Sequence, residues 1–397
     1  MSNYKIEDNS PTKIKVVGIG GGGSNAVKRM LEENMHSVEF IAVNTDVQVL
    51  NHYSSQVKDK SLVTFPIGKD LTHGLGAGGR PDIGKKAAEE DSENIENLLK
   101  GSDMVFLTAG MGGGTGTGAI SVFGKIAKKV GALTVAVVTL PFDFEGKRKM
   151  QLAQEGVKEL TECVDAIIVI PNQKLFKVAE NTTSVLNAFK LADDVLLNGV
   201  KGISDLITNT GLINVDFNDL KAIMDCSGAA LMGIGVGQGE NGDLDAATHA
   251  INNPLLEDIS IKGAKGVLIN VTGGEDLTLN SLKRIVDFIQ EYVDENASVK
   301  SGLVIDPTKS GQIQVSIVAT GFPKKEQTKE VEIIEIQEDE SKTISAAQWE
   351  SSIEDPLSSY TSKFSNQYHG EENSSTFSTP EHFALPAFLR EAMIKKK

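Results

Sequence analysis

The chain has 397 residues, of which 40% are hydrophobic, so it is long enough for two or three domains with buried cores. Its net charge of −15 argues against nucleic acid as a partner, and its two cysteines argue against a disulfide framework. Because we find no apolar leader and no bilayer-length apolar run, we expect a cytoplasmic protein. The six histidines never cluster, so we expect no protein-ligated metal.

The first predicted unit is a strand, a glycine loop and a helix. The apolar run Ile14–Ile19 predicts the strand, and Gly20–Gly23 closes it. Ser24 and Asn25 then open a helix over Ala26–Glu33.

Another buried strand, Phe40–Val43, ends in Asn44, Thr45 and Asp46. A further glycine-rich loop, residues 74–79, then leads into a predicted helix over residues 83–100.

The segment Thr108–Gly118, TAGMGGGTGTG, lies between an apolar run, Met104–Leu107, and a helical period over Ala119–Val130. Glycine lets a backbone approach a ligand, and the unpaired N–H groups of a helix start suit a phosphate. Thr115 and Thr117 would add hydroxyl donors. The alternative is a tight turn without a ligand, but six glycines exceed what a turn requires. The loop lacks the lysine of a P-loop.

Two further strands are predicted at Leu133–Leu140, before PFDFEG (141–146), and at Ala166–Ile170, before Pro171 and Asn172. Strands that alternate with helices imply a parallel, doubly wound sheet. Ligands bind such sheets beyond the carboxyl ends of the strands, where the glycine loops lie.

Apolar residues recur at a helical period through Ser184–Thr208, which predicts one long helix. Phe189 and Asp193 are four residues apart and share a face of it. Such a pair can stack on a base and accept both the N1–H and the 2-amino group of guanine, which adenine lacks. The alternative is a core phenylalanine beside a solvated aspartate, and Asp194 is easily confused with Asp193.

A second, smaller α/β unit is predicted to end near residue 321. Its helices are expected at 243–251 and 279–291, and its strands within 229–239 and at 266–271, 303–306 and 312–319. A polar, disordered linker follows from residue 324 to about residue 380. The last segment, Glu381–Lys397, is apolar again and is predicted to bind a partner, unless it packs on the parent domain.

Several motifs occur together at consistent spacing. They are GGGGSNAV (20–27), NTD (44–46), GLGAGGRP (74–81), TAGMGGGTGTG (108–118), PFDFEG (141–146), ADDVL (192–196), GLINVDFNDL (211–220) and ALPAFLR (384–390). Together they resemble the FtsZ family of bacterial tubulin-like cell-division GTPases, over residues 13–322 and the extreme C-terminus.

The resemblance implies a tubulin-like α/β fold with six parts. These are a GTP-binding domain (13–183), a central helix (184–209), a catalytic loop with its following helix (210–228), a C-terminal α/β domain (229–322), a disordered linker (323–380) and a partner-binding tail (381–397). It also implies GTP hydrolysis to GDP with Mg²⁺ and head-to-tail self-assembly into a division ring at mid-cell. Membrane-tethered division adaptors and regulators would dock on the tail, so membrane contact would be indirect.

The resemblance also implies the nucleotide contacts. They fall on Gly21, Gly22, Gly23, Ser24, Asn25, Gly114, Thr115, Gly116, Glu145, Lys149, Asn172, Phe189 and Asp193. The family usually has arginine where Lys149 stands, and a lysine offers charge without a bidentate fork. We therefore expect a weaker contact at this position.

Asn214, Asp216 and Asp219 form a second candidate site that would position the attacking water. The two aspartates also fit an N-terminal cap for the next helix, which is compatible with catalysis. Sixteen residues of helix from Asp193 to Asn209 separate the sites by roughly 24 Å at 1.5 Å per residue. The acidic pair is therefore expected to act on GTP bound by the next molecule, in a head-to-tail contact that propagates into a filament.

Two other functions are compatible with parts of the sequence. An NAD-dependent oxidoreductase would use Gly18–Gly23 as a GxGxxG motif with Asp46 at a suitable distance, but it leaves Thr108–Gly118 unexplained and lacks a catalytic His or Tyr constellation. A non-catalytic nucleotide-binding scaffold would not need Asp216 and Asp219.

Overall fold

The computed structural model describes residues 12–33, 35, 37–56, 62–177, 184–208, 215–224, 228–253, 261 and 263–322. They all belong to one compact unit. Asn214, the predicted linker and the predicted tail lie outside the described residues. None of the helices in the described ranges is long and apolar enough to cross a membrane.

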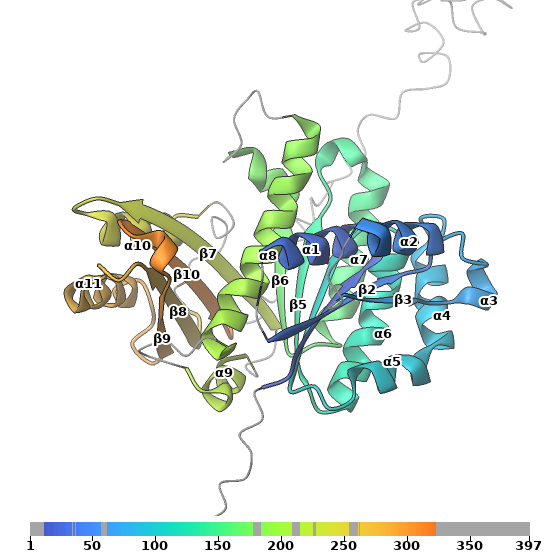
Figure 1. Ribbon diagram of the computed structural model, residues 1–397, viewed down its shortest axis with the longest axis horizontal. Helices are drawn as coiled ribbons and strands as arrows, with labels where there is room; N and C mark the ends of the chain where they lie inside the picture. Colours follow the sequence, from blue (N-terminus) through green and yellow to red (C-terminus); the bar gives the residue numbers. More distant parts are fainter. Residues whose placement is uncertain are drawn as a thin grey trace, which may run out of the picture. The chain divides into compact units, whose positions relative to one another are not determined.

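The N-terminal half is built on a parallel sheet, as predicted. Its strands are β1 (Ile14–Ile19), β2 (Val38–Asn44), β3 (Leu62–Pro66), β4 (Met104–Gly110), β5 (Leu133–Leu140) and β6 (Ala166–Pro171). They pair in parallel in the order β3-β2-β1-β4-β5-β6 (Figure 1). The strand order reverses between β1 and β4, and a crevice beyond the carboxyl ends of the strands forms at such a point.

Helices cover both faces of this sheet. One face carries α1 (Gly20–Glu32) and α8 (Val185–Thr208), and the other carries α4 (Pro81–Glu90), α5 (Ser92–Leu99), α6 (Thr115–Lys129) and α7 (Lys147–Thr161). The half also contains α2 (Val47–Gln56), α3 (Lys69–Thr72), η1 (Asp143–Glu145) and η2 (Asn172–Lys177). Successive strand residues such as Val16 and Val17 point to opposite faces of the sheet and are buried in the hydrophobic core on each side. Because both faces are buried, the strands appear in the sequence as continuous apolar runs.

The C-terminal half continues the same sheet in the order β6-β7-β10-β8-β9. Its elements are α9 (Phe217–Met224), β7 (Gly228–Gln238), α10 (Gly242–Ile251), β8 (Gly266–Gly273), α11 (Leu279–Gln290), β9 (Ser298–Ile305), η4 (Pro307–Lys309) and β10 (Gln312–Thr320). β10 pairs antiparallel with β7 and β8, whereas β8 and β9 are parallel. α10 and α11 pack on one face of these strands.

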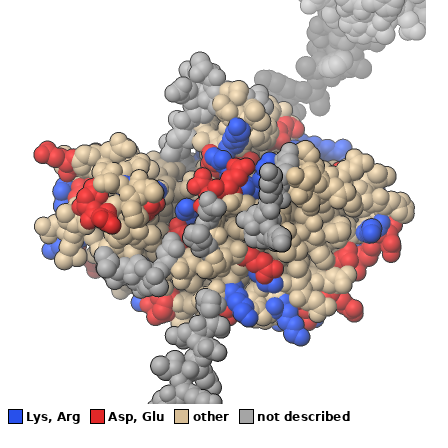
Figure 2. Space-filling model, viewed as in Figure 1, with Lys and Arg blue, Asp and Glu red and all other residues tan. Residues whose placement is uncertain are grey.

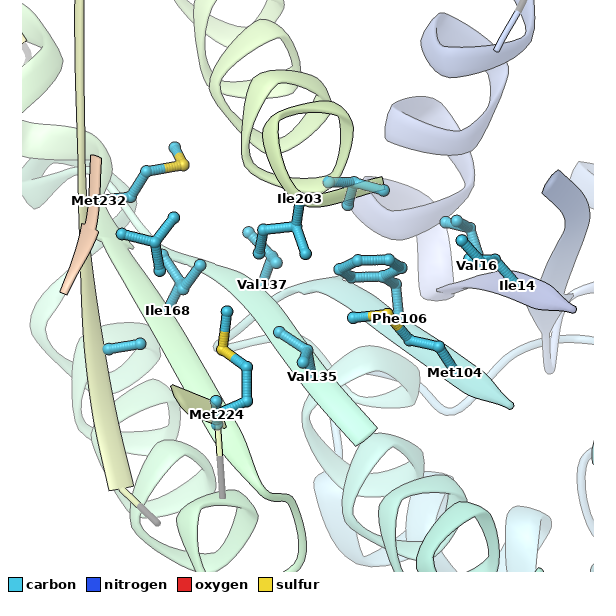
Figure 3. Packing of buried hydrophobic residues seen from close by; sticks show 14 of the residues in the cluster. Ile14, Val16, Met104, Phe106, Val135, Val137, Ile168, Ile203, Met224 and Met232 are labelled. Atoms are coloured by element: carbon cyan, nitrogen blue, oxygen red, sulfur yellow. The ribbon is translucent and has the colours of Figure 1, made fainter. Parts of the chain in front are cut away.

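The long helix α8 belongs to the core of both halves. Figure 3 shows Ile203 of α8 beside Val137 and Phe106 of the N-terminal strands, with Met224 and Met232 of the C-terminal half in the same cluster. This shared packing fixes the end of α8 that carries Phe189 relative to α9 at its other end.

Three predicted helices have different boundaries in the structure. The helix predicted over Ala119–Val130 begins earlier, at Thr115, within the glycine loop. The helix predicted over Ala26–Glu33 begins earlier, at Gly20, because glycines carry no side chain from which a helical period can be read. The helix predicted over residues 83–100 is two helices, divided at Asp91. The Asp91 carboxylate accepts a hydrogen bond from the Gly68 N–H at 2.8 Å, which ties the junction of the two helices to the residue before α3.

Besides the short 3-10 helices, four elements were not predicted: α2, β3, α3 and α7. Few of their residues are buried: none of β3 is fully buried, only Thr72 of α3 is, and only Ala153, Gly156 and Leu160 of α7 are. β9 begins at Ser298, five residues before the predicted strand, because its first residues are partly exposed and polar.

Candidate functional site

A pocket of about 360 Å³ lies between the segments that follow β1 and β4, where the strand order reverses. Pockets of this size are typical of small-ligand sites. Eleven of the residues assigned to nucleotide contact line it: Gly21, Gly22, Asn25, Gly114, Thr115, Gly116, Glu145, Lys149, Asn172, Phe189 and Asp193. The structure therefore gathers residues from six separate elements around one space.

Gly23 and Ser24 do not line the pocket. A Cβ atom on Gly23 would lie 2.3 Å from the Thr108 carbonyl oxygen, so glycine here lets α1 pack directly against β4. Ser24 is 1% exposed, and its hydroxyl has no hydrogen-bond partner among the described residues. Neither residue is placed to contact a ligand in this pocket directly.

Several lining residues were missed by the sequence analysis. They are Gly20, Gly110, Met111, Gly113, Thr139, Pro141, Ala192 and Leu196. The signal was present for some of them: Gly20 and Gly113 lie inside the glycine runs, and Ala192 and Leu196 are three and seven residues after Phe189 on the same helix face.

The glycine loop after β4 is held by its own threonine. Thr117 does not line the pocket; its hydroxyl accepts a hydrogen bond from the Gly112 N–H at 2.8 Å, and Gly112 has a φ of 97° that favours glycine. In this structure Thr117 therefore holds the loop and does not face the pocket. Thr115 does line the pocket, and its hydroxyl lies 2.6 Å from that of Thr45.

Charged and polar groups converge on the pocket beside this loop. Lys149 forms an ion pair with Glu145, and Glu145 also accepts a hydrogen bond from the Phe142 N–H at 2.9 Å. Lys149 is the one cation among the described lining residues, so it is placed to meet an anion. Asn172 is buried, and its side-chain oxygen has no partner among the described residues, so it is available to a ligand hydroxyl.

The far end of the pocket is formed by α8. Asp193 lines it, whereas Asp194 forms an ion pair with Arg29 at 2.9 Å and does not, which separates the two neighbours. Burial, with a contribution from the charge of Asp194, raises the pKa of Asp193 to about 7, and Arg29 opposes this shift. Phe189 is 39% exposed and meets the ring of Phe142 edge-on, with centroids 5.4 Å apart.

Asn25 is held by a residue that the sequence analysis overlooked. The hydroxyl of Tyr53 on α2 donates a hydrogen bond to the Asn25 side-chain oxygen. Burial, and then the charge of Asp193, raise the pKa of Tyr53, which keeps this donor protonated. The Asn25 amide nitrogen is thereby directed away from Tyr53.

The second candidate site lies outside the pocket, at the start of α9. Asp216 caps this helix, because its side chain accepts the Asp219 N–H at 2.7 Å and its carbonyl accepts the Leu220 N–H at 3.1 Å. The predicted capping role is therefore confirmed. Fifteen residues of α8 from Asp193 to Thr208 span roughly 22 Å at 1.5 Å per residue.

Acidic and basic side chains are interspersed over the face of the molecule in Figure 2, without one extended basic area. Among the described residues, no group of three or more His, Cys, Asp or Glu side chains is arranged to hold a metal ion.

Comparisons with known proteins agree with this geometry. Residues 13–180 match the Tubulin/FtsZ family GTPase domain, and residues 228–323 match the FtsZ family C-terminal domain. The cell division protein FtsZ of Coxiella burnetii is 49% identical over 321 residues, which cover 80% of this chain and 82% of that protein.

Solved structures show the same likeness. An empty FtsZ dimer from M. jannaschii matches with a TM-score of 0.74 and 46% identity, over 79% of this chain and 89% of that one. GDP-bound CetZ1 from Haloferax volcanii matches in fold with a TM-score of 0.66 at 20% identity, over 79% of this chain and 95% of that one.

Proposed function

This chain belongs to the FtsZ family of tubulin-like GTPases, and from that premise we propose that it binds GTP in the pocket and hydrolyses it within head-to-tail filaments. The observation that carries the proposal is the separation of two half-sites. The pocket holds the groups suited to a nucleotide, and the acidic pair Asp216 and Asp219 stands at the other end of α8. The comparisons give no support to an oxidoreductase or to a non-catalytic scaffold.

At the base end, we propose that Asp193 accepts both donors of guanine while Phe189 packs against the ring. An ionised carboxylate accepts two parallel N–H groups, and adenine cannot supply them. The burial of Asp193 strengthens this discrimination, because a buried acceptor left without donors is costly.

At the phosphate end, we propose that the N–H groups of Gly21, Gly22 and Gly114–Gly116 bind the phosphates with the charge of Lys149. Two helices, α1 and α6, direct their N-termini there, and helix N-termini favour anions. Glu145 and the unpartnered oxygen of Asn172 would accept hydrogen bonds from the ribose hydroxyls.

We also propose that Mg²⁺ accompanies the nucleotide. No carboxylate cluster among the described residues could cage it, which fits a Mg²⁺ ion bound mainly through phosphate oxygens and water. Bound there, it would offset the negative charge that develops on the phosphates.

Hydrolysis in this proposal occurs at the junction of two subunits. A water oxygen bonds to the γ-phosphorus as the bond from that phosphorus to the β–γ bridging oxygen breaks. Asp216 and Asp219 of the next subunit accept hydrogen bonds from this water and orient it, and one of these carboxylates takes up the proton that the water loses. Asn214, two residues before Asp216 in the sequence, is proposed to assist them. The length of α8 supports action in trans, since the chain's own pocket is too distant.

The rim of the pocket supports a contact with another subunit. Phe144 and Phe176 are 60% and 51% exposed, and both meet the ring of Phe142, which in turn meets the lining residue Phe189. Exposed apolar groups gathered around a site commonly mark an interface. A contact between this rim and the α9 end of another molecule is heterologous, so it repeats along a filament.

The proposal predicts that turnover depends on protein concentration. Specific GTPase activity should be near zero below a threshold and rise above it, because dilute subunits have no neighbour to complete the site. Phosphate release measured from nanomolar to micromolar protein, beside sedimentation of polymer, tests this expectation. A flat specific activity over that range would show that each chain hydrolyses GTP alone.

We further propose that Glu381–Lys397 docks membrane-tethered adaptors and regulators, placing the filaments in the cytoplasm at mid-cell. Its apolar cluster follows a polar linker, and exposed apolar clusters commonly mark interaction sites.

Deleting the segment should leave GTP turnover unchanged but remove membrane-associated rings from cells, and Phe388→Ala should cause most of the same loss of rings. A scrambled tail of the same composition is the control. Normal rings from the tail-deleted protein would contradict the proposal.

A further inference from the structure

A cation contacts one member of the acidic pair, Asp219, in the first turn of α9. The ammonium of Lys300 is 3.0 Å from a carboxylate oxygen of Asp219, and both side chains are a little over one-third exposed. Lys300 belongs to β9, the last strand of the sheet, where it pairs opposite Leu268. The contact therefore joins the edge of the C-terminal half to the first turn of α9.

The rest of α9 is already fixed to this half of the molecule. Leu220, Ile223 and Met224 are buried, and the Thr320 hydroxyl donates a hydrogen bond to the Ile223 carbonyl at 2.7 Å. Asp216 closes the first turn through the Asp219 N–H. These contacts do not set the direction of the Asp219 carboxylate, and among the described residues Lys300 is the cation that contacts it.

The charge of Lys300 also affects how this acidic face approaches the triphosphate bound by the neighbouring subunit. Two carboxylates that approach a triphosphate repel it, and the repulsion grows as water leaves the junction. A cation paired with one carboxylate reduces that repulsion and keeps the side chain in one rotamer.

We propose that Lys300 is a positioning residue of the hydrolytic face, which holds the Asp219 carboxylate in the orientation that directs water at the neighbouring subunit's γ-phosphate. The inference rests on the proposed function, because Asp219 must act in trans. It adds a residue from β9, eighty-one positions from Asp219, to the reaction.

The test compares Lys300→Gln, Lys300→Arg and Lys221→Gln in the full-length protein. Lys221 lies on the exposed side of α9 and its change to glutamine removes the same charge without touching Asp219. We expect Lys300→Gln to lower turnover per assembled subunit about tenfold, and Lys300→Arg to stay within about threefold of native. Lys221→Gln should stay within about twofold. The KM for GTP and the melting temperature should be unchanged in all three.

Two results would overturn the inference alone. One is equal turnover in Lys300→Gln and Lys221→Gln. The other is an equal loss of turnover in Lys300→Gln and Lys300→Arg together with a lowered melting temperature, which would mark a purely structural role. Asp219→Asn assayed in parallel separates these from a failure of the proposed function. If Asp219→Asn keeps native turnover, hydrolysis in trans by Asp219 is wrong and the inference falls with it.

Discussion

Asp219→Asn protein should bind GTP as tightly as the native protein but hydrolyse it about 10²- to 10⁴-fold more slowly, the usual effect of losing a group that handles the reacting proton. Binding should persist because Asp219 does not line the pocket. Asp245→Asn is the matched control, since Asp245 is also exposed in the first turn of a helix, α10, but lies in neither half-site. Phosphate release above the assembly threshold, together with nucleotide titration, measures both effects.

Mixing two inactive proteins distinguishes hydrolysis in trans from hydrolysis in cis. Asp219→Asn retains the pocket, and Asp193→Ala retains the acidic pair. The GTP concentration is chosen to saturate the Asp219→Asn protein but not the Asp193→Ala protein. A complete site then forms wherever the acidic pair of an Asp193→Ala subunit meets the GTP-filled pocket of an Asp219→Asn subunit. The mixture should therefore exceed the summed rates of the two proteins assayed separately. Rates that merely add would show that the acidic pair serves its own chain.

Asp193→Ala should weaken GTP binding by at least about 100-fold, because two hydrogen bonds to a charged acceptor are worth about 1.5–3 kcal/mol each. ATP binding, which does not use these bonds, should not weaken, so the preference for GTP should collapse. Competition titration with both nucleotides measures the change. Equal affinities of the native protein for ATP and GTP would remove the basis of the assignment.

The pH dependence of GTP affinity provides a second test of the role of Asp193. Burial, and then the charge of Asp194, raise the pKa of Asp193 to about 7 in the free protein, and guanine requires the ionised form. Below pH 7, binding must release a proton, so GTP affinity should fall about tenfold per pH unit, and above pH 7 it should level off. Asp194→Asn should move the bend to lower pH, because it removes a like charge. The Asp193→Asn side chain cannot titrate, so the pH dependence that remains in this variant is the part that comes from protonation of the nucleotide phosphates.

Local signals in the sequence determined most of the nucleotide-binding half. The bounds of β1 and β5 were predicted to the residue, since runs of buried apolar residues bounded by glycine or proline admit little else. The parallel order of the sheet followed from alternation of strands and helices, and the pocket followed from the glycine loops at the strand ends. The spacing of Phe189 and Asp193 placed both on one face of α8, where the structure has them lining the pocket.

Only the tertiary structure decided which of several plausible side chains face the pocket. Asp194 is withdrawn by Arg29, 165 residues away in the sequence, and Thr117 is occupied by the backbone of its own loop. The pairing of Lys300 with Asp219 depends on β9 lying at the edge of the sheet beside α9. A residue's type and periodicity give its face and its chemistry, but the direction of a polar side chain depends on the partners that folding brings to it from elsewhere in the chain.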